Sequence, residues 1–237
     1  NQQHHQPSAN QASKLMTQLT LHRIFNDPDL NGSSPVALKF SPDGSRVTYL
    51  KPSQENFERL DLWAFNVATQ QTRLLVDASE LVSGQRILSD EEKARRERKR
   101  ITQTGIVEYF WSPKSNAILF PLNGNLFLYH LDQAETLQQL TTDVTFETDL
   151  HFSPDGRFLS FVRNQNLFCI EVATGVERQL TLDGSGTISN GVAEFIAQEE
   201  MHRFDGYWWS PDSQSIAFIQ VDEGTVELSQ RYEIDAD

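Results

Sequence analysis

The sequence predicts an all-β protein, namely a partial β-propeller with about four blades of a presumed eight and with helical insertions. A motif of an aromatic residue, Ser, Pro and then Asp-Gly or a related pair occurs four times, at residues 40–44, 111–115, 152–156 and 209–213. A short run rich in β-branched and aromatic residues follows each copy. The second and third copies lie 41 residues apart, which is the length of a bare propeller blade.

Each motif predicts the corner between two antiparallel strands. The aromatic residue, Phe40 in the first copy, ends one strand. Pro fixes its φ angle for a turn, and Asp-Gly tolerates the positive φ angle that reverses the chain. The next strands are expected at residues 46–50, 117–120, 158–162 and 216–219, third strands at 60–65, 125–129 and 166–170, and outer strands at 73–76 and 178–181.

The composition limits the possible partners. The 237 residues include 33 acidic and 20 basic side chains, a formal net charge of −13. Duplex DNA and anionic membranes require clustered Lys and Arg, so this balance argues against nucleic acid and favours a cationic ligand. The single cysteine, Cys169, excludes an intramolecular disulfide and a multi-cysteine zinc site. It lies in an apolar run, where we expect a small buried side chain.

Residues 1–18 are predicted to form a flexible leader, because their polar, Gln- and His-rich composition cannot bury enough apolar surface to become ordered. No stretch of the chain approaches the roughly 18–20 apolar residues of a membrane span. The leader suggests a periplasmic or secreted protein, while the lone cysteine is equally compatible with the alternative, a cytoplasmic one.

A first insertion is predicted at residues 78–104, in the longest interval between motif copies. Ser89 and Glu92 have the spacing of a capping box, which predicts a helix that runs through Arg100. This helix carries the only strongly basic run of the chain. The alternative is a solvated helix whose acidic start and basic end match the helix dipole.

A second insertion is predicted at residues 190–207 and contains the adjacent carboxylates Glu199 and Glu200. On a short helix Phe195 shares a face with Glu199, and Ile196 lies beneath Glu200. We expect this apolar base to hold both carboxylates toward the mouth of the propeller. The alternative is a pair of Glu residues on a solvated surface.

The sequence contains side chains that can bind a ligand, but it shows no catalytic motif. A G-x-S-x-G nucleophile elbow does not occur, and residues 184–186, Gly-Ser-Gly, lack its spacing. His130, His151 and His202 stand apart without a metal-binding pattern, and there is no glycine-rich phosphate loop. We therefore expect no metal, no cofactor and no catalytic residue in this chain.

Three segments, at residues 190–201, 206–212 and 221–223, resemble the double-Glu region of the dipeptidyl peptidase IV family, serine peptidases of the prolyl oligopeptidase clan. Their defining letters are NG followed by EEM, GYWWSPD, and VDE. The basic run at residues 95–101 and the Gly-Ile-Val at 105–107 are similar to the arginine-bearing insertion of the bacterial members and the cytosolic relatives. The resemblance covers residues 19–237.

This resemblance implies a hydrolase that releases X-Pro or X-Ala dipeptides from peptide substrates with a free N-terminus. The family has an eight-bladed N-terminal propeller and a C-terminal α/β-hydrolase domain that contains the catalytic triad. Residues 19–237 would be the N-terminal part of that propeller. We therefore expect the chain to be a fragment, inactive alone, of an enzyme that is a homodimer at full length.

The resemblance also implies substrate-binding roles. Glu199 and Glu200 would bind the substrate α-ammonium, and Arg100 would bind a substrate carbonyl, with Arg98 as the alternative. Anchoring the ammonium would select the second peptide bond, because residues of an extended chain repeat every ~3.3–3.6 Å. Two other classes are a non-catalytic propeller scaffold for protein binding, and an oligopeptidase or acylaminoacyl peptidase of the same clan, which lacks the paired Glu.

Overall fold

The computed structural model describes residues 19–26, 30, 32–52, 56–81, 90–132, 135–142 and 145–227. They belong to two units, residues 1–34 and 35–237. In the first unit, helix α1 (Leu21–Phe25) begins after Thr20, whose hydroxyl accepts a hydrogen bond from the backbone N–H of Arg23 at 3.2 Å. This contact satisfies a backbone donor that has no partner within the helix. No helix among these residues is long and apolar enough to cross a membrane.

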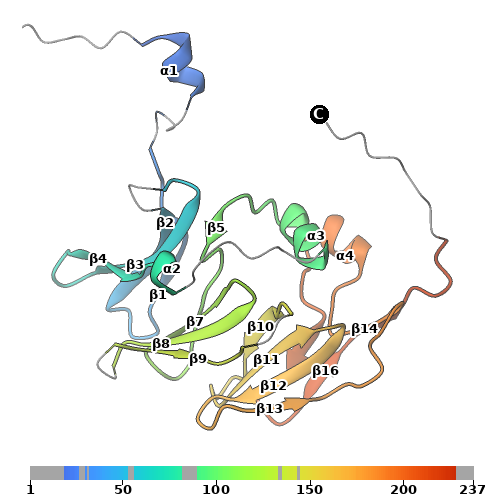
Figure 1. Ribbon diagram of the computed structural model, residues 1–237. Coiled ribbons are helices and arrows are strands. Elements are labelled where there is room, and N and C mark those ends of the chain that lie inside the picture. Colours follow the sequence, from blue (N-terminus) through green and yellow to red (C-terminus); the bar gives the residue numbers. More distant parts are fainter. Residues whose placement is uncertain are drawn as a thin grey trace, which may run out of the picture. The chain divides into compact units, whose positions relative to one another are not determined.

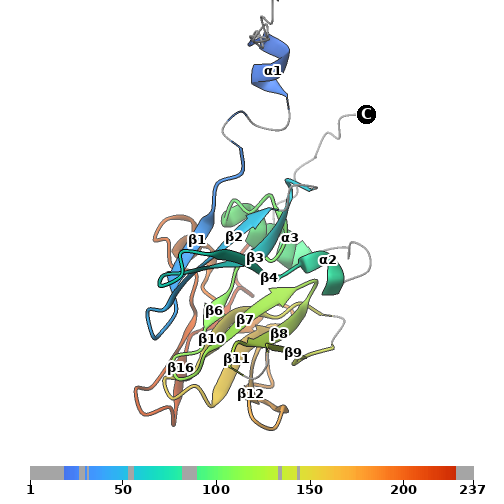
Figure 2. The same ribbon diagram turned by 90° about the vertical axis from the view of Figure 1, so that its left-hand side faces the viewer.

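The second unit contains three antiparallel four-stranded blades, in which strands that follow one another in sequence pair in space (Figures 1 and 2). The first blade consists of β1 (Val36–Phe40), β2 (Arg46–Pro52), β3 (Arg59–Asn66) and β4 (Thr72–Val76). The second consists of β6 (Phe110–Trp111), β7 (Ala117–Leu122), β8 (Asn125–His130) and β9 (Thr136–Gln139). The third consists of β10 (Thr148–Phe152), β11 (Phe158–Arg163), β12 (Asn166–Glu171) and β13 (Val176–Gln179). The predicted class, a partial β-propeller, is confirmed.

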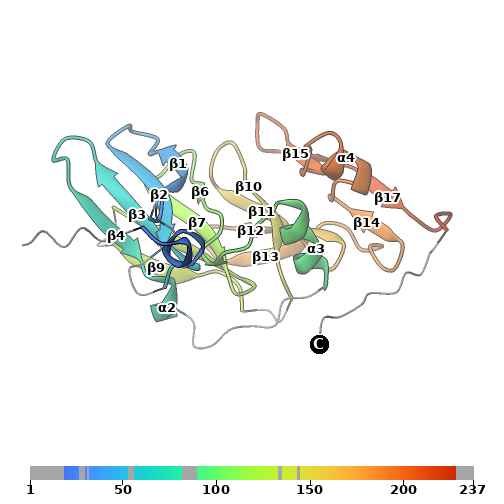
Figure 3. The ribbon, with the colours of Figure 1, turned by 90° about the horizontal axis from the view of Figure 1, so that it is seen from above.

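The fourth motif copy is followed by a smaller arrangement than expected. Strands β15 (Tyr207–Trp209) and β16 (Ile216–Phe218) pair with each other, but β17 (Gln220–Asp222) pairs with β14 (Ile188–Asn190) (Figure 3). The expected strand at 216–219 therefore ends one residue early, and its continuation crosses to the segment that precedes α4. Within residues 145–227 the fourth copy forms two strand pairs instead of a four-stranded blade.

The outer strand of the third blade also differs from its prediction. It was expected at residues 178–181, whereas β13 ends at Gln179. Beyond this end, the hydroxyl of Thr181 accepts a hydrogen bond from the backbone N–H of Leu167 at 2.9 Å. The N–H of Leu180 still donates to the carbonyl of Leu167 at 2.7 Å, so only the acceptor for the Leu167 N–H is a side chain instead of a backbone carbonyl.

The repeated motif forms the predicted corner. All four aromatic residues end a strand, namely Phe40, Trp111, Phe152 and Trp209. In the third copy, the buried hydroxyl of Ser153 donates to Asp155 at 2.7 Å and accepts from the N–H of Phe158 at 2.9 Å. Gly156 has a φ angle of 73°, in the left-handed region that favours glycine. The motif is therefore a turn closed by its own side chains.

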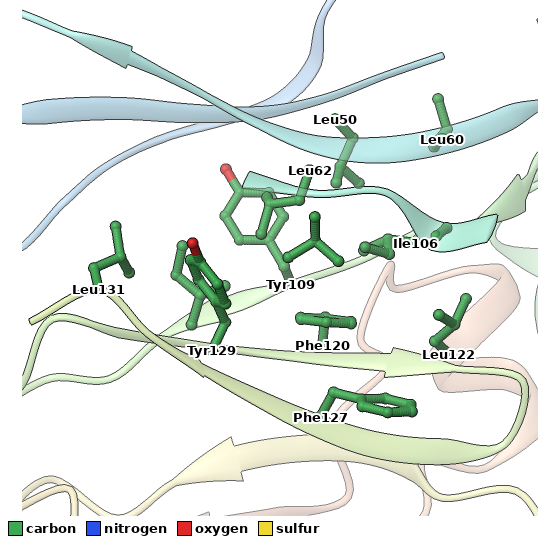
Figure 4. Packing of buried hydrophobic residues seen from close by; sticks show 13 residues of the cluster. Leu50, Leu60, Leu62, Ile106, Tyr109, Phe120, Leu122, Phe127, Tyr129 and Leu131 are labelled. Atoms are coloured by element: carbon green, nitrogen blue, oxygen red, sulfur yellow. The ribbon is translucent and has the colours of Figure 1, made fainter. Parts of the chain in front are cut away.

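Side chains between the first and second blades form a buried apolar core (Figure 4). Leu50 and Leu62 come from the first blade, Phe120 comes from the second, and each has 0% of its surface exposed. Phe120 stacks on Phe127 with ring centroids 5.6 Å apart. Burial of a large apolar side chain contributes about 1.5–3 kcal/mol. A similar core joins the second and third blades. Cys169 is buried, as expected.

A tyrosine and a tryptophan two residues apart connect the first blade to the second, and a second such pair, Tyr207 and Trp209, connects the third blade to the strands of the fourth copy. The hydroxyl of Tyr109 lies 2.7 Å from the carbonyl oxygen of Ala37, and Trp111 donates to the hydroxyl of Thr48 at 2.9 Å. Burial raises the pKa of Tyr109 to about 12, so the hydroxyl keeps its proton. Near the fourth copy, Trp209 donates to the hydroxyl of Ser160 at 2.7 Å. Directional bonds thus supplement apolar packing at both places.

The first insertion contains α2 (Ala78–Leu81), α3 (Asp90–Arg98) and the short strand β5 (Thr104–Gly105). β5 pairs in parallel with the start of β3 and ties the end of the insertion to the first blade. A Cβ atom on Gly105 would lie 2.3 Å from the carbonyl oxygen of Leu60, so this close approach requires glycine. The second insertion contains α4 (Phe195–Glu199).

Candidate functional site

Helices α3 and α4 come from the two insertions and lie side by side (Figures 1 and 3). The ends of both helices border a pocket of about 970 Å³. Acidic, basic and aromatic side chains from segments far apart in the sequence line this pocket: Glu97, Arg98, Lys99, Arg100, Ile101, Phe195, Gln198, Glu199, His202 and Phe204.

Helix α3 ends two residues before the predicted end at Arg100. The N–H of Arg100 donates to the carbonyl of Glu97 at 3.0 Å, and the N–H of Ile101 donates to that of Arg96 at 2.8 Å. Arg100 has a φ angle of 54°, so the chain leaves the helix through a left-handed residue. The expected capping residue Ser89 lies outside the described residues.

Helix α4 is short and begins at a cap that the sequence analysis did not predict. The carboxylate of Glu194 accepts hydrogen bonds from the N–H groups of Ile196 and Ala197 at 2.7 and 2.8 Å. Ala197 is the buried residue of this helix. Phe195 and Ile196 are each 58% exposed, so the expected apolar base beneath the carboxylates is wrong. A helix of five residues buries one small side chain and leaves the larger ones outside.

Arg98 is the cation that contacts Glu199. Its Nε atom lies 3.8 Å from Oε1 of Glu199, and its guanidinium carbon lies 5.7 Å from the ring centroid of Phe195. Exposed fractions of the two ion-pair side chains are 26% for Arg98 and 42% for Glu199. Solvent screens a pair at this exposure, and a ligand can exchange with either partner.

The other two predicted site residues lie nearby. Arg100 is exposed and lines the same pocket. Glu200 is the exposed C-cap residue of α4, and its N–H donates to the carbonyl of Ile196 at 2.9 Å. Glu200 is not among the residues that line the pocket. The structure thus brings Glu199, Arg98 and Arg100 to one pocket and leaves Glu200 outside its lining.

Several side chains of this region were not singled out from the sequence. Phe195 and Phe204 provide aromatic walls of the pocket, and Lys99 lies with its ammonium 5.2 Å from the ring centroid of Phe204. Glu108 binds the inner face of α3. A pair of basic residues one helical turn apart, Arg95 and Lys99, was the available signal for an acidic partner beneath the helix.

The pocket offers the carboxylates of Glu97 and Glu199, the guanidinium groups of Arg98 and Arg100, the ammonium of Lys99 and aromatic surface. This set suits a ligand that has a cation and an acceptor oxygen a short distance apart, since each charge of the ligand would find an opposite charge. Among the residues that the structure describes, no group of three or more His, Cys, Asp or Glu side chains is arranged to hold a metal ion.

Comparison with known proteins gives consistent matches. Residues 140–237 match the family profile described as the dipeptidyl peptidase IV (DPP IV) N-terminal region. Human dipeptidyl peptidase 8 is 27% identical over 86% of this chain and 25% of its own length. Dipeptidyl aminopeptidase A of Saccharomyces cerevisiae is 36% identical over 32% of this chain and 8% of its own length. This chain therefore spans about a quarter or less of these relatives.

A solved structure supports the fold independently. The crystal structure of Porphyromonas gingivalis dipeptidyl peptidase 4 matches 78% of this chain and 25% of its own chain, with a TM-score of 0.51 and 24% sequence identity. At this identity the likeness concerns the fold, and it agrees with the successive antiparallel blades of residues 35–227.

Proposed function

The similarities to dipeptidyl peptidases assign the chain to the dipeptidyl peptidase IV family, and from that premise we propose that it is the substrate-recognition part of a serine exopeptidase. The complete enzyme would release X-Pro or X-Ala dipeptides from the N-termini of peptides. The observation that carries this proposal is the position of Glu199 opposite Arg98, in a pocket that two separate insertions build.

In this proposal, the substrate α-ammonium binds the carboxylates of Glu199 and Glu200. The ammonium has three donors, and each charge-assisted hydrogen bond in a partly desolvated site contributes about 1.5–3 kcal/mol. Before substrate binds, Arg98 compensates the charge of Glu199 at 3.8 Å. Arrival of a second cation weakens that pair and releases the guanidinium to bind a substrate carbonyl, a role for which Arg100 is the alternative.

The distance between the carboxylates and the nucleophile would select the bond that is cut. An extended peptide advances ~3.3–3.6 Å per residue, so a fixed ammonium places the second peptide bond at a fixed position. The nucleophile belongs, in this proposal, to a hydrolase domain outside these 237 residues. We further propose a periplasmic or secreted enzyme that is a homodimer at full length.

The 237-residue polypeptide alone is expected to release no dipeptide, because none of its segments contains a nucleophile elbow. Chromogenic Gly-Pro and Ala-Pro substrates measure this directly. Turnover that persists after removal of contaminating peptidases would contradict the assignment of the reaction centre to another part of the enzyme.

The decisive test uses Glu199→Ala and Glu200→Ala in the full-length peptidase. Each change should cost about 2 kcal/mol or more in kcat/KM on free-amine substrates, since the ammonium loses half of its pairing. N-acylated substrates, which lack the cation, should be poor for wild type and variants. Glu171→Ala, in the third blade, removes a carboxylate outside the pocket and is the control. Wild-type kcat/KM in both site variants would contradict the proposal and favour a non-catalytic propeller scaffold.

A further inference from the structure

Glu108, in the segment between β5 and β6, contacts one cation of helix α3 and one that directly follows the helix. Its Oε1 atom lies 2.6 Å from Nη2 of Arg95, and its Oε2 atom lies 3.7 Å from Nζ of Lys99. Arg95 and Lys99 are four residues apart, so their side chains emerge on the same face of the helix. Each carboxylate oxygen therefore binds one cation, and the two contacts together fix both the position and the rotation of the helix.

This ionic contact is largely withdrawn from water. The exposed side-chain fractions are 12% for Arg95, 19% for Glu108 and 21% for Lys99. Burial alone would raise the pKa of Glu108, but the charges of Arg95 and Lys99 outweigh it and lower the pKa. The carboxylate is thus ionised at neutral pH, and its hydrogen bond to Arg95 is stronger than one at a solvated surface.

Helix α3 is attached through polar contacts, which besides those of Glu108 include a hydrogen bond from the guanidinium of Arg96 to the carbonyl oxygen of Gln103 at 3.2 Å. Its sequence, DEEKARRER, is almost entirely charged and provides no apolar stripe to bury against a blade. Nine residues are also too few for a helix that is stable by itself in water. Within the helix, the buried side chain of Glu92 binds Arg96 at 2.8 Å, which supports helicity.

The C-terminal end of the same helix borders the pocket, and Lys99 itself is one of the lining residues. Arg98 lies three residues after Arg95 and one before Lys99, and Arg100 follows directly at the left-handed exit. Loss of the inner contact would let the helix rotate or detach, and the guanidinium of Arg98 would leave its place 3.8 Å from Glu199.

We propose that Glu108 is a positioning residue for substrate recognition, which holds Arg98 and Arg100 toward Glu199 by binding Arg95 and Lys99. The effect on catalysis rests on the proposed function, whereas the effect on the helix does not. Glu108 touches no substrate in this account, so its loss should weaken substrate binding and leave the chemical step intact.

The first measurement follows the helix itself. In the full-length protein, Glu108→Gln should increase amide hydrogen exchange within α3 by about tenfold or more, with no change in β7 and β11. Glu108→Asp retains a carboxylate and should give an intermediate increase, so it also serves if Glu108→Gln folds poorly. Glu135→Gln, which removes the same charge from the exposed pair with Arg73, is the matched control. Unchanged exchange in α3 would overturn the inference.

The second measurement compares KM and kcat on free-amine dipeptide substrates. Glu108→Gln should raise KM about tenfold with kcat within about twofold, Glu108→Asp should restore part of the loss, and Glu135→Gln should match wild type. Glu199→Gln is measured in parallel. If Glu199→Gln raises KM and Glu108→Gln does not, the inference alone fails. If Glu199→Gln has no effect, the proposed function fails, and hydrogen exchange still decides whether Glu108 holds the helix.

Discussion

The interface between the first two blades and the pocket between α3 and α4 use aromatic and polar groups in opposite ways. In the interface, Phe120 is fully buried and stacks on Phe127. At the pocket, Phe195 is 58% exposed beside the guanidinium of Arg98. In the interface, the hydrogen bonds of Tyr109 and Trp111 join uncharged groups, whereas Arg98 and Glu199 at the pocket are charged and reach solvent.

This difference separates stability from recognition. The blades bury large apolar side chains and form a rigid frame. The insertions place exposed aromatic and charged side chains on short helices. Side chains at the pocket are thus available to a ligand because the fold does not depend on them. Changes in the interface should alter unfolding, and changes at the pocket should alter binding.

The largest expected difference between the two regions is in the free energy of unfolding, when a Phe of each region is replaced by Ala. Phe120→Ala should lower the free energy of unfolding by about 3–5 kcal/mol, because it removes a fully buried ring and leaves a cavity. Phe195→Ala should lower it by less than about 1 kcal/mol, since most of that ring is already in water. Urea unfolding of both variants measures the difference. Equal losses would contradict the separation.

Tyr109→Phe tests the directional bonds of the interface. The change removes a hydroxyl that lies 2.7 Å from the carbonyl oxygen of Ala37 and leaves that acceptor without its partner. The expected loss in the free energy of unfolding is about 1–2 kcal/mol. Tyr49→Phe, at a partly exposed tyrosine of the first blade, is the control and should change stability by less than about 0.5 kcal/mol. A similar loss in both variants would contradict a specific contribution of the bond to Ala37.

Arg98→Ala and Arg100→Ala address the pocket. Arg98 contacts both Glu199 and Phe195, so its loss should lower kcat/KM of the full-length peptidase about tenfold, and the loss of Arg100 should have a smaller effect. Each change should shift the urea midpoint no more than an ordinary surface substitution does. A larger kinetic effect of Arg100→Ala would assign the carbonyl-binding role to Arg100.

The smallest expected effect concerns the repeated corner at acid pH. Hydrogen bonds from the Ser153 hydroxyl and from the backbone N–H of Arg157 lower the pKa of Asp155 to about 2. Since the folded pKa is below that of an unfolded Asp, ~3.9, the ionised group stabilises the fold above about pH 4. This contribution is lost as the pH falls toward 2. Asp155→Asn should therefore lose less stability than wild type between pH 5 and pH 2 in urea unfolding, and identical losses would contradict the role of Asp155.

The blades were predictable from the sequence because each corner contains its own bonding partners. Ser153 and Asp155 are two residues apart, and the pattern that closes the turn is visible in the letters. The fourth copy was mispredicted because the partner of β17 is β14, which lies before the motif and outside its pattern. Local chemistry fixes the corner, whereas strand pairing depends on segments distant in sequence.

The pocket was predictable only in part. Paired carboxylates and a basic run indicated Glu199 and the arginine helix, but the end of that helix was placed too late because Arg100 adopts a left-handed conformation usually filled by glycine. The exposure of Phe195 follows from the length of α4, which the sequence does not define. The position of Glu108 beneath α3 depends on the pairing of β5 with β3, which no local sequence pattern indicates.

The central claim is that Glu199 binds the substrate ammonium within the pocket between α3 and α4. A crystal structure of the full-length peptidase with a slowly cleaved tripeptide tests it most directly. The account predicts the ammonium nitrogen within about 3.2 Å of a Glu199 carboxylate oxygen and a guanidinium of Arg98 or Arg100 on a peptide carbonyl. An ammonium bound elsewhere, with the contact between Arg98 and Glu199 unchanged, would contradict the account.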